Sequence, residues 1–350
     1  MVTIDGSITG VSVGNPEPAL VSVIVPCLNT AKTIELCIKA VLAQTYSSVE
    51  MIVVDDGSTD GTAEIARRHD CTVIQLPSNI GTGPARNRGI AASRGSILFF
   101  LDSDVALAPD AVANAVRILE ENPGYGGVWG VYADRPLVDD GLVERVQVLH
   151  AHYRQIRKLG PARTGHFAGG AIRRSVVDEV GGFDEKLGPI NEDTEYSLRI
   201  AERFPMVRTT EIVGYHDDDD KVSSVVRKCF KRAMRLVPLA LTKRDSRFER
   251  EATYRPQEVA AVFLGTVTLP LAVFSVYLLA VPLAFLAWFV AADRGRLGFV
   301  RRNAGWRLVL PCVALNYTYC LTISAAALSG GLCYLVDPRF RRRWSGAVAD

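Results

Sequence analysis

Disulfide frameworks and zinc sites are the first features that this 350-residue sequence lacks. Its seven cysteines form no Cys-x-x-Cys pair, their number is odd, and three of them lie in an apolar tail. Paired or clustered cysteines are what a stapled secreted domain or a zinc site requires. The cysteine usage therefore argues against both and favours a reducing cytoplasm.

The sequence also lacks several segments that are typical of other protein classes. Residues 1–20 contain no basic region followed by an apolar stretch, so we expect a loose leader and no signal peptide. No internal repeat and no low-complexity tract is present. A Gly-x-Gly-x-x-Gly turn is missing after the first predicted strand, where the chain reads PCLN from Pro26 to Asn29. This absence argues against a dinucleotide-dependent oxidoreductase.

Apolar residues, in contrast, are abundant and concentrate towards the C-terminal end. They make up 48% of the chain, which is high for a purely soluble protein. We predict a membrane domain over residues 257–350, built on apolar tracts at 259–292 and 308–336. As a helix, the first tract would be roughly 50 Å long, against a hydrocarbon core of ~30 Å. It is therefore either one long tilted span or a bent hairpin, with Pro270 or Pro282 near the bend.

Arginines flank these apolar tracts. They fill the loop between the tracts and follow the second one: Arg294, Arg296, Arg301, Arg302, Arg307, Arg339 and Arg341–Arg343. The positive-inside rule places both groups on the cytoplasmic side. That is satisfied if each tract enters and leaves by the same face. We therefore predict a cell-membrane protein that is multi-pass or re-entrant, with hairpins favoured over two single crossings.

A basic juxtamembrane segment, residues 217–256, precedes the apolar tracts. Between Lys221 and Pro256 the chain carries eleven Lys and Arg against three acidic residues. Such an excess can indicate nucleic-acid binding, but beside an apolar tract membrane lipids with anionic head groups are the better partner, and we expect no nucleic acid. Residues Lys221–Leu241 predict a basic amphipathic helix. It would lie in the head-group plane or pack on the preceding domain.

Residues 21–216 alternate short apolar runs with helical stretches. The predicted strands are Val21–Val25, Met51–Val54, Thr72–Leu76 and Ile97–Leu101, and the predicted helices are Thr33–Thr45, Thr62–His69, Pro84–Ser93 and Ala108–Glu121. This alternation indicates an α/β fold whose mostly parallel sheet is covered on both faces. In such sheets ligands bind beyond the carboxyl ends of the strands.

Polar residues follow these strands at the expected edge. Asn29 comes after the first strand, Asp55 and Asp56 end the second, and Asp102 and Asp104 follow the fourth. Two carboxylates so close together are poor core material, because an unpaired buried charge is costly. They are good ligands for a hard divalent cation that also holds phosphates. Alone, the Asp-x-Asp pair is equally consistent with a solvated strand end.

Six motifs in a fixed order resemble those of the family 2 glycosyltransferases. They are VSVIVPCLNTAKTIELCIKAVLAQTY, MIVVDDGSTDGT, NIGTGPARNRGI, LFFLDSDV, FAGGAIRRSVVDEVGGFDE and NEDTEYSLRI, within about residues 21–216. The resemblance implies a GT-A fold, with a Rossmann-like sheet, and inverting transfer of a sugar from a nucleotide-sugar. Here C-terminal transmembrane helices would follow that domain. The Gln-x-x-Arg-Trp motif of processive synthases is missing, which argues against chain extrusion.

The resemblance also implies a set of donor-binding residues. They are Pro26, Asn29, Asp55, Asp56, Gly83, Arg86, Asp102, Gly169, Gly170 and Glu192. Pro26 and Asn29 would contact the nucleoside, and Asp56 would accept hydrogen bonds from its base. Gly169 and Gly170 would let the sugar approach the backbone closely.

The same resemblance makes Asp102 and Asp104 ligands of Mn²⁺ or Mg²⁺, with Asp104 bound directly. His216 would be a third ligand, as in some family members, or else an ordinary surface histidine. Asp193 would be the catalytic general base that deprotonates an acceptor hydroxyl, a form of help worth ~10²–10⁴ in rate. Acidic residues at a helix start, such as Glu192 and Asp193, also suit the helix dipole alone.

The sequence thus predicts a metal-dependent, inverting enzyme at the cytoplasmic membrane face. It would move one sugar from a UDP- or GDP-linked donor to a hydroxyl of a lipid-linked or cell-envelope glycan. A phosphate acceptor needs no base, so the Glu-Asp motif at Asp193 favours the hydroxyl. Two alternatives stay open, namely transfer to polyprenyl phosphate and a catalytically inactive scaffold for glycan assembly. The oligomeric state is not predicted.

Overall fold

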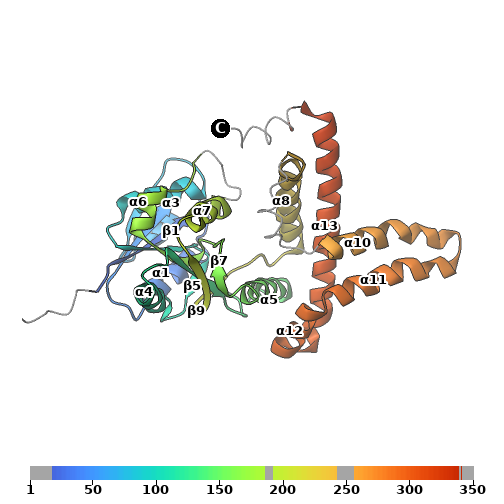
Figure 1. Ribbon diagram of the computed structural model, residues 1–350, viewed down its shortest axis with the longest axis horizontal. Helices are drawn as coiled ribbons and strands as arrows, with labels where there is room; N and C mark the ends of the chain where they lie inside the picture. The colour runs from blue at the N-terminus through green and yellow to red at the C-terminus, as the bar shows by residue number, and fades with distance from the viewer. Residues whose placement is uncertain (1–17, 186–191, 243–255, 339, 341–350) are drawn as a thin grey trace, which may run out of the picture.

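The structure is a computed structural model that describes residues 18–185, 192–242, 256–338 and 340. Most of the predicted leader, part of the basic segment (residues 243–255), and Arg339 and Arg341–Arg343 lie outside the described residues. An α/β unit forms the N-terminal part, and a group of helices forms the C-terminal part (Figure 1).

Four parallel strands form the first half of the sheet. They are β1 (Val21–Cys27), β2 (Val49–Asp55), β3 (Thr72–Gln75) and β4 (Ile97–Leu101), in the order β3-β2-β1-β4. Every residue of β1 and β4 is buried. Continuous apolar runs such as these suit strands covered on both faces, and all four predicted strands are confirmed.

The second half of the sheet is mixed. It contains β5 (Val105–Leu107), β6 (Gly127–Tyr132), β7 (Gly160–Ala162), β8 (Gly169–Arg173) and β9 (Met206–His216). The order continues β4-β8-β6-β9-β5, with β7 beside β9. β8 is antiparallel to both β4 and β6, and β9 is parallel to β6. The carboxyl ends of β4, β6 and β9 therefore meet at one edge.

Helices cover both faces of this sheet (Figure 1). They are α1 (Ile34–Leu42), α2 (Thr62–Ala66), α3 (Thr82–Ala92), α4 (Ala111–Glu121), α5 (Leu142–Ile156), α6 (Arg174–Val180) and α7 (Glu192–Ala201). One buried cluster joins α1 and α4 to the strands through Ile38 and Leu119. A second cluster, with Trp129 and Tyr196, packs α7 on the other face. The predicted α/β class is confirmed.

The first apolar tract is a hairpin. Its elements are α10 (Pro256–Thr268), the short helices η1 (Leu269–Val273) and η2 (Val276–Leu279), and α11 (Ala280–Ala292). α10 and α11 lie side by side, and the chain reverses between Val273 and Val276 (Figure 1). At this tip Val273, Phe274 and Tyr277 are 83–87% exposed. So large an apolar projection suits lipid better than water.

The second apolar tract is one helix, α13 (Val309–Val336), where the sequence favoured a hairpin. Its only proline, Pro311, lies in the first turn, where proline is tolerated, so nothing interrupts the helix. By length and composition, Pro256–Val273 and Trp306–Val336 could each cross a membrane. A pair of helices bent by 60°, Val276–Ala292 and Arg294–Ala304, could form a third, broken span.

A buried charged bridge joins the hairpin to the α/β unit. α12 (Arg294–Ala304) places Arg296, which is 4% exposed, against Asp293 at the end of α11. Its Nη1 also donates to the ring of His150 in α5, at 2.7 Å from Nε2. Breaking a buried pair of this kind is strongly destabilising, so the bridge fixes the hairpin base on α5.

The predicted amphipathic helix is α8 (Val222–Thr242), and it runs alongside α13 (Figure 1). Val225 on its apolar side is 3% exposed and packs in one cluster with Val146 of α5 and Leu315 of α13. α8 therefore packs against both α5 of the preceding domain and α13, with Lys228 and Arg232 exposed.

Candidate active site

The structure brings the three predicted metal ligands to one edge of the sheet. Asp102 follows β4, Asp104 precedes β5, and His216 ends β9 opposite Val105. His216 Nε2 lies 3.6 Å from Asp104 Oδ2, and its Nδ1 lies 3.7 Å from Asp218 Oδ2. The pairing of β5 with β9 thus unites residues that are more than a hundred positions apart.

These groups fit a divalent cation. Asp104 Oδ1 and His216 Nδ1 are buried, and neither has a hydrogen-bond partner among the described residues. Burial opposes charge on the imidazole, but Asp104, Asp218 and Asp102 outweigh it and raise the pKa of His216 to about 9. Carboxylate oxygens with one imidazole form a donor set suited to Mn²⁺ or Mg²⁺.

Tyr132 is a site residue that sequence reasoning missed. It ends β6, and its ring stacks on His216 with centroids 4.5 Å apart and planes 13° apart. Burial, followed by the charges of Asp102 and Asp104, raises the pKa of Tyr132 well above its usual value. Its position at the end of a strand could have identified Tyr132 from the sequence, but β6 was not among the predicted strands.

Arg86 joins the predicted metal site to the predicted base. Its side chain is 2% exposed and lies over the rings of Phe167 and Phe183, with centroid distances of 5.6 and 5.3 Å. Nη2 donates to Asp102 Oδ1 at 2.9 Å, and Nη1 donates to Asp193 Oδ1 at 2.5 Å. One guanidinium therefore holds both carboxylates.

The charge balance around Arg86 favours a site that is completed by a cation. Burial above all, with the charges of Asp104 and Asp193 added to it and that of Arg86 opposing them, raises the pKa of Asp102 to about 7. One buried guanidinium thus stands against several carboxylates, including Glu192 at 3.9 Å. A bound cation would supply the missing positive charge.

Asp193 is held at the start of α7 and stays accessible. Its Oδ2 accepts from the Phe167 amide at 3.4 Å, and its side chain is 30% exposed. The Ser197 hydroxyl, one turn on, donates to the Asp193 carbonyl at 2.6 Å and accepts from the Gly165 amide at 2.9 Å. The base candidate is therefore tied to the loop before β8.

Glu192 and Gly83, two of the predicted donor-binding residues, lie next to each other beside Arg86. A Cβ added to Gly83 would stand 3.4 Å from Phe183 and 3.6 Å from Glu192, so α3 approaches α7 closely there. Burial and the charge of Asp193 raise the pKa of Glu192. The structure thus brings Gly83, Arg86, Glu192 and Asp193 together.

The predicted nucleoside-contacting residues tie three loops to one another. Asn29, with a left-handed φ of 53°, accepts from the Thr59 amide at 2.9 Å, while Pro26 lies within β1. Asp55 is fully buried and accepts from the Ser58 amide at 3.2 Å.

Asp56, 4% exposed, accepts from the Ile80 and Gly81 amides at 2.7 and 3.0 Å. Its carboxylate therefore holds the loop that leads into α3. This structural role is additional to the predicted contact with the nucleotide base of the donor.

The two predicted glycines of β8 differ in their surroundings. A Cβ added to Gly169 would meet nothing within 4 Å, as the approach of a ligand requires. A Cβ added to Gly170 would lie 2.2 Å from the ring of Trp129. Core packing against Trp129 therefore explains why position 170 is a glycine. Position 169 has room for a side chain, so packing does not explain the glycine there.

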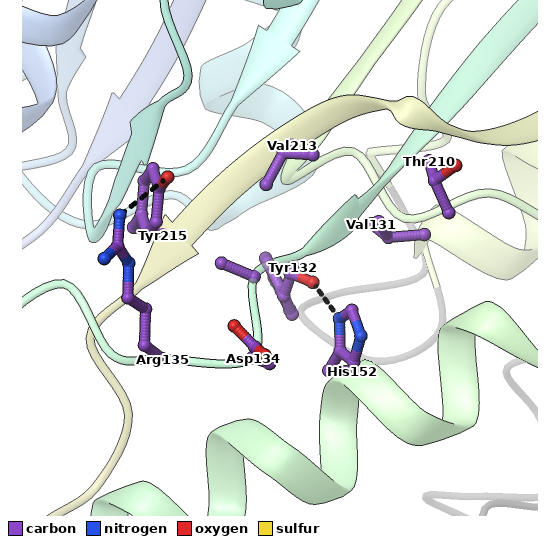
Figure 2. A pocket seen from close by; sticks show the side chains of 9 residues that line it. Val131, Tyr132, Asp134, Arg135, His152, Thr210, Val213 and Tyr215 are labelled. Atoms are coloured by element: carbon purple, nitrogen blue, oxygen red, sulfur yellow. Dashed lines mark hydrogen bonds between the residues drawn. The ribbon is translucent and has the colours of Figure 1, made fainter. Parts of the chain in front are cut away.

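Two other features lie near this edge. A cavity of about 380 Å³ is lined by Tyr132, Arg135, His152 and Tyr215, among others, and none of the predicted residues lines it (Figure 2). Among the described residues, Asp140, Glu144 and Asp217 are the one group of possible metal ligands whose oxygen atoms all lie within 4.8 Å of one another. Lys32 forms ion pairs with Asp140 and Asp217, so its ammonium group already balances part of the negative charge of these three carboxylates.

Comparison with known proteins identifies the family to which the α/β domain is similar. Residues 22–181 match the model of glycosyl transferase family 2. An uncharacterized glycosyltransferase of Haemophilus influenzae is 26% identical over 210 residues, 59% of this chain and 71% of that protein. Glycosyltransferase AglE of Haloferax volcanii is 48% identical over 91 residues, 24% of this chain and 30% of that protein.

The name of a third relative states its donor, acceptor and linkage. The Escherichia coli UDP-Glc:alpha-D-GlcNAc-diphosphoundecaprenol beta-1,3-glucosyltransferase WfaP is 30% identical over 126 residues, 35% of this chain and 50% of that protein. The chain thus spans about a third of the Haloferax relative and half of the Escherichia coli one.

Among solved structures, the mannosyltransferase PcManGT from Pyrobaculum calidifontis, in complex with GDP-Man and Mn²⁺, superposes with a TM-score of 0.55. The match covers 89% of this chain and 88% of that one at 22% identity, which shows a shared fold. With the motifs, the sheet and the family match in agreement, residues 22–181 of this chain form a glycosyl transferase family 2 domain.

Proposed function

We propose that this protein is a metal-dependent, inverting glycosyltransferase of the membrane surface. It moves one sugar from a UDP- or GDP-linked donor to a hydroxyl of a lipid-linked or cell-envelope glycan on the cytoplasmic face. One observation carries the proposal. Arg86 binds Asp102, beside the candidate metal ligands, and Asp193, the candidate base, through the two ends of one guanidinium.

In this mechanism Asp104, His216 and Asp102 would hold a cation, either Mn²⁺ or Mg²⁺. Its positive charge would offset the charge that develops on the departing nucleoside diphosphate. The loops at Asn29 and Asp56 hold the nucleoside, and the open backbone at Gly169 receives the sugar.

Asp193 takes the proton from the acceptor hydroxyl, which attacks the anomeric carbon from the face opposite the diphosphate. The bond to the diphosphate breaks as the new glycosidic bond forms, so the configuration inverts. Arg86 orients the Asp193 carboxylate, and the Phe167 amide fixes its second oxygen. Such positioning is what makes general-base help effective.

Three observations support the choice of substrates. The family is defined by glycosyl transfer, the E. coli relative is named for a diphosphoundecaprenol-linked acceptor, and the Pyrobaculum neighbour was solved with GDP-Man and Mn²⁺. The apolar hairpin and α13 of this chain suit a lipid environment, where a lipid-linked acceptor would be found.

A panel of UDP- and GDP-sugars tests the proposal. We expect one donor to give nucleotide release that requires Mn²⁺ or Mg²⁺, and the joint substitution Asp102→Ala with Asp104→Ala to abolish it. No metal-dependent release with any donor would favour an inactive scaffold. Efficient transfer to polyprenyl phosphate by an Asp193→Asn variant would favour the phosphate acceptor instead.

A further inference from the structure

The basic residues of α8 divide into two groups by the direction they face. Val225 is buried against α5 and α13, which fixes the rotation of the helix about its axis. At 100° per residue, Lys228 and Arg232 lie one turn apart on a shared stripe. Arg227 and Lys231 fall on another side of the helix, and all four are exposed.

The stripe of Lys228 and Arg232 faces the catalytic edge. Lys228 Nζ lies 2.9 Å from a carboxylate oxygen of Asp219, which follows His216 by three residues. The charge of Arg232 acts on Glu192 in α7, where it opposes the rise in the pKa of that carboxyl. In the view of Figure 1, α8 stands between α7 and α13, and it packs against α13. The contact of Lys228 with Asp219 and the effect of Arg232 on Glu192 put this stripe on the side of α8 that carries Asp219 and Glu192.

We infer that Lys228 and Arg232 bind the phosphate groups of a lipid-linked acceptor. The inference rests on the proposed function and narrows its acceptor to a glycan carried on a lipid phosphate or diphosphate. In such a molecule the phosphate lies between the sugar and the lipid. The sugar must reach Asp193, and the lipid chain would lie against the apolar helix α13. The guanidinium of Arg232 can bind two phosphate oxygens at once, and the ammonium of Lys228 can bind phosphate as a point charge.

Arg227 and Lys231 provide an internal control. They carry the same charge on the same helix but not on the stripe that faces Asp219 and Glu192. Anionic head groups would attract every exposed basic residue of α8 in proportion to its charge. A specific acceptor site would depend on Lys228 and Arg232 alone.

The probe is farnesyl diphosphate, titrated into the full chain in neutral detergent with EDTA present, so that no metal-held diphosphate contributes. We expect the double substitution Lys228→Gln with Arg232→Gln to raise the dissociation constant at least about tenfold, as loss of charge-assisted hydrogen bonds implies. The matched pair Arg227→Gln with Lys231→Gln should bind as the wild type does. Farnesol, which lacks phosphate, should bind weakly to all three proteins.

Several results would overturn the inference. They are no binding by the wild type, equal losses in the two double variants, or full displacement of the probe by phosphatidylglycerol in mixed micelles. Charge-conserving changes, Lys228→Arg and Arg232→Lys, check for misfolding, because they should retain most of the binding. The proposed function is judged separately, by whether a UDP- or GDP-sugar with Mn²⁺ stabilises the wild type thermally.

Discussion

The ring of Tyr132 lies flat against His216, with centroids 4.5 Å apart, although β6 and β9 carry them from distant parts of the sequence. The stack sets the plane of the imidazole, and the imidazole faces Asp104. A group that orients a metal ligand in this way commonly affects metal affinity by ~10–100-fold.

Replacing Tyr132 should therefore weaken metal binding without removing a ligand. We expect Tyr132→Leu to raise the Mn²⁺ concentration for half-maximal nucleotide release by about tenfold. Tyr132→Phe keeps the stacked ring and should stay near the wild type. If Tyr132→Phe lost as much as Tyr132→Leu, the hydroxyl and not the stack would matter.

Arg86 is expected to matter for stability as well as for turnover. Arg86→Leu leaves Asp102 and Asp193 without their shared cation. These two side chains are 35% and 30% exposed, so water reduces the free-energy cost of the unpaired charges. We expect destabilisation of about 2 kcal/mol together with loss of transfer.

Arg86→Lys keeps one charge but cannot reach both carboxylates in the same way, so it should recover stability more than activity. Thermal unfolding and nucleotide release, measured on the same preparations, check this. Full activity in Arg86→Lys would mean that the two-ended contact is dispensable.

The two glycines of β8 should separate packing from ligand approach. Gly170→Ala drives a Cβ into the Trp129 ring and should destabilise the domain by ~1–3 kcal/mol. Gly169→Ala meets open space, so it should fold normally and raise KM for the donor. Unfolding midpoints and donor KM values for the pair test this, and equal stability in both variants would contradict it.

Metal removal should be reversible and specific to the proposed ligands. Dialysis against EDTA should abolish nucleotide release, and added Mn²⁺ should restore it. In Asp104→Asn, which removes charge from the oxygen facing His216, restoration should require at least about tenfold more Mn²⁺. Activity that survives EDTA in the wild type would contradict the whole assignment.

The hairpin tip should hold the protein in lipid. Phe274→Asp together with Tyr277→Asp places two charges where the wild type exposes large apolar rings. We expect a clear shift of the protein from the membrane to the soluble fraction, or aggregation when detergent is withdrawn. The matched changes Phe274→Leu and Tyr277→Leu preserve apolar character and should leave the distribution unchanged.

The sequence predicted the four parallel strands of the first half of the sheet, most clearly where a strand is one continuous apolar run. β1 and β4 are buried at every position, so a local pattern was sufficient. It missed β6, because Gly127 and Gly130 dilute the apolar signal of that strand, which depends on its neighbours in the sheet. Tyr132 could not be assigned for the same reason.

The family resemblance named site residues, but the contacts among them needed the three-dimensional structure. Arg86 was predicted to contact the donor, and its pairing with Asp102 and Asp193 joins positions far apart in the chain. The direction of α8 likewise follows from packing against α13, since an amphipathic pattern fits a lipid surface and a protein surface equally well.

The bridge between Arg296 and His150 has a consequence for which acceptors can react. The bridge ties α5 to the base of the α10–α11 hairpin. With that hairpin in a membrane, as the proposed function requires, the candidate site would stand at a set height above the lipid and would accept lipid-linked glycans whose reacting end lies at that height.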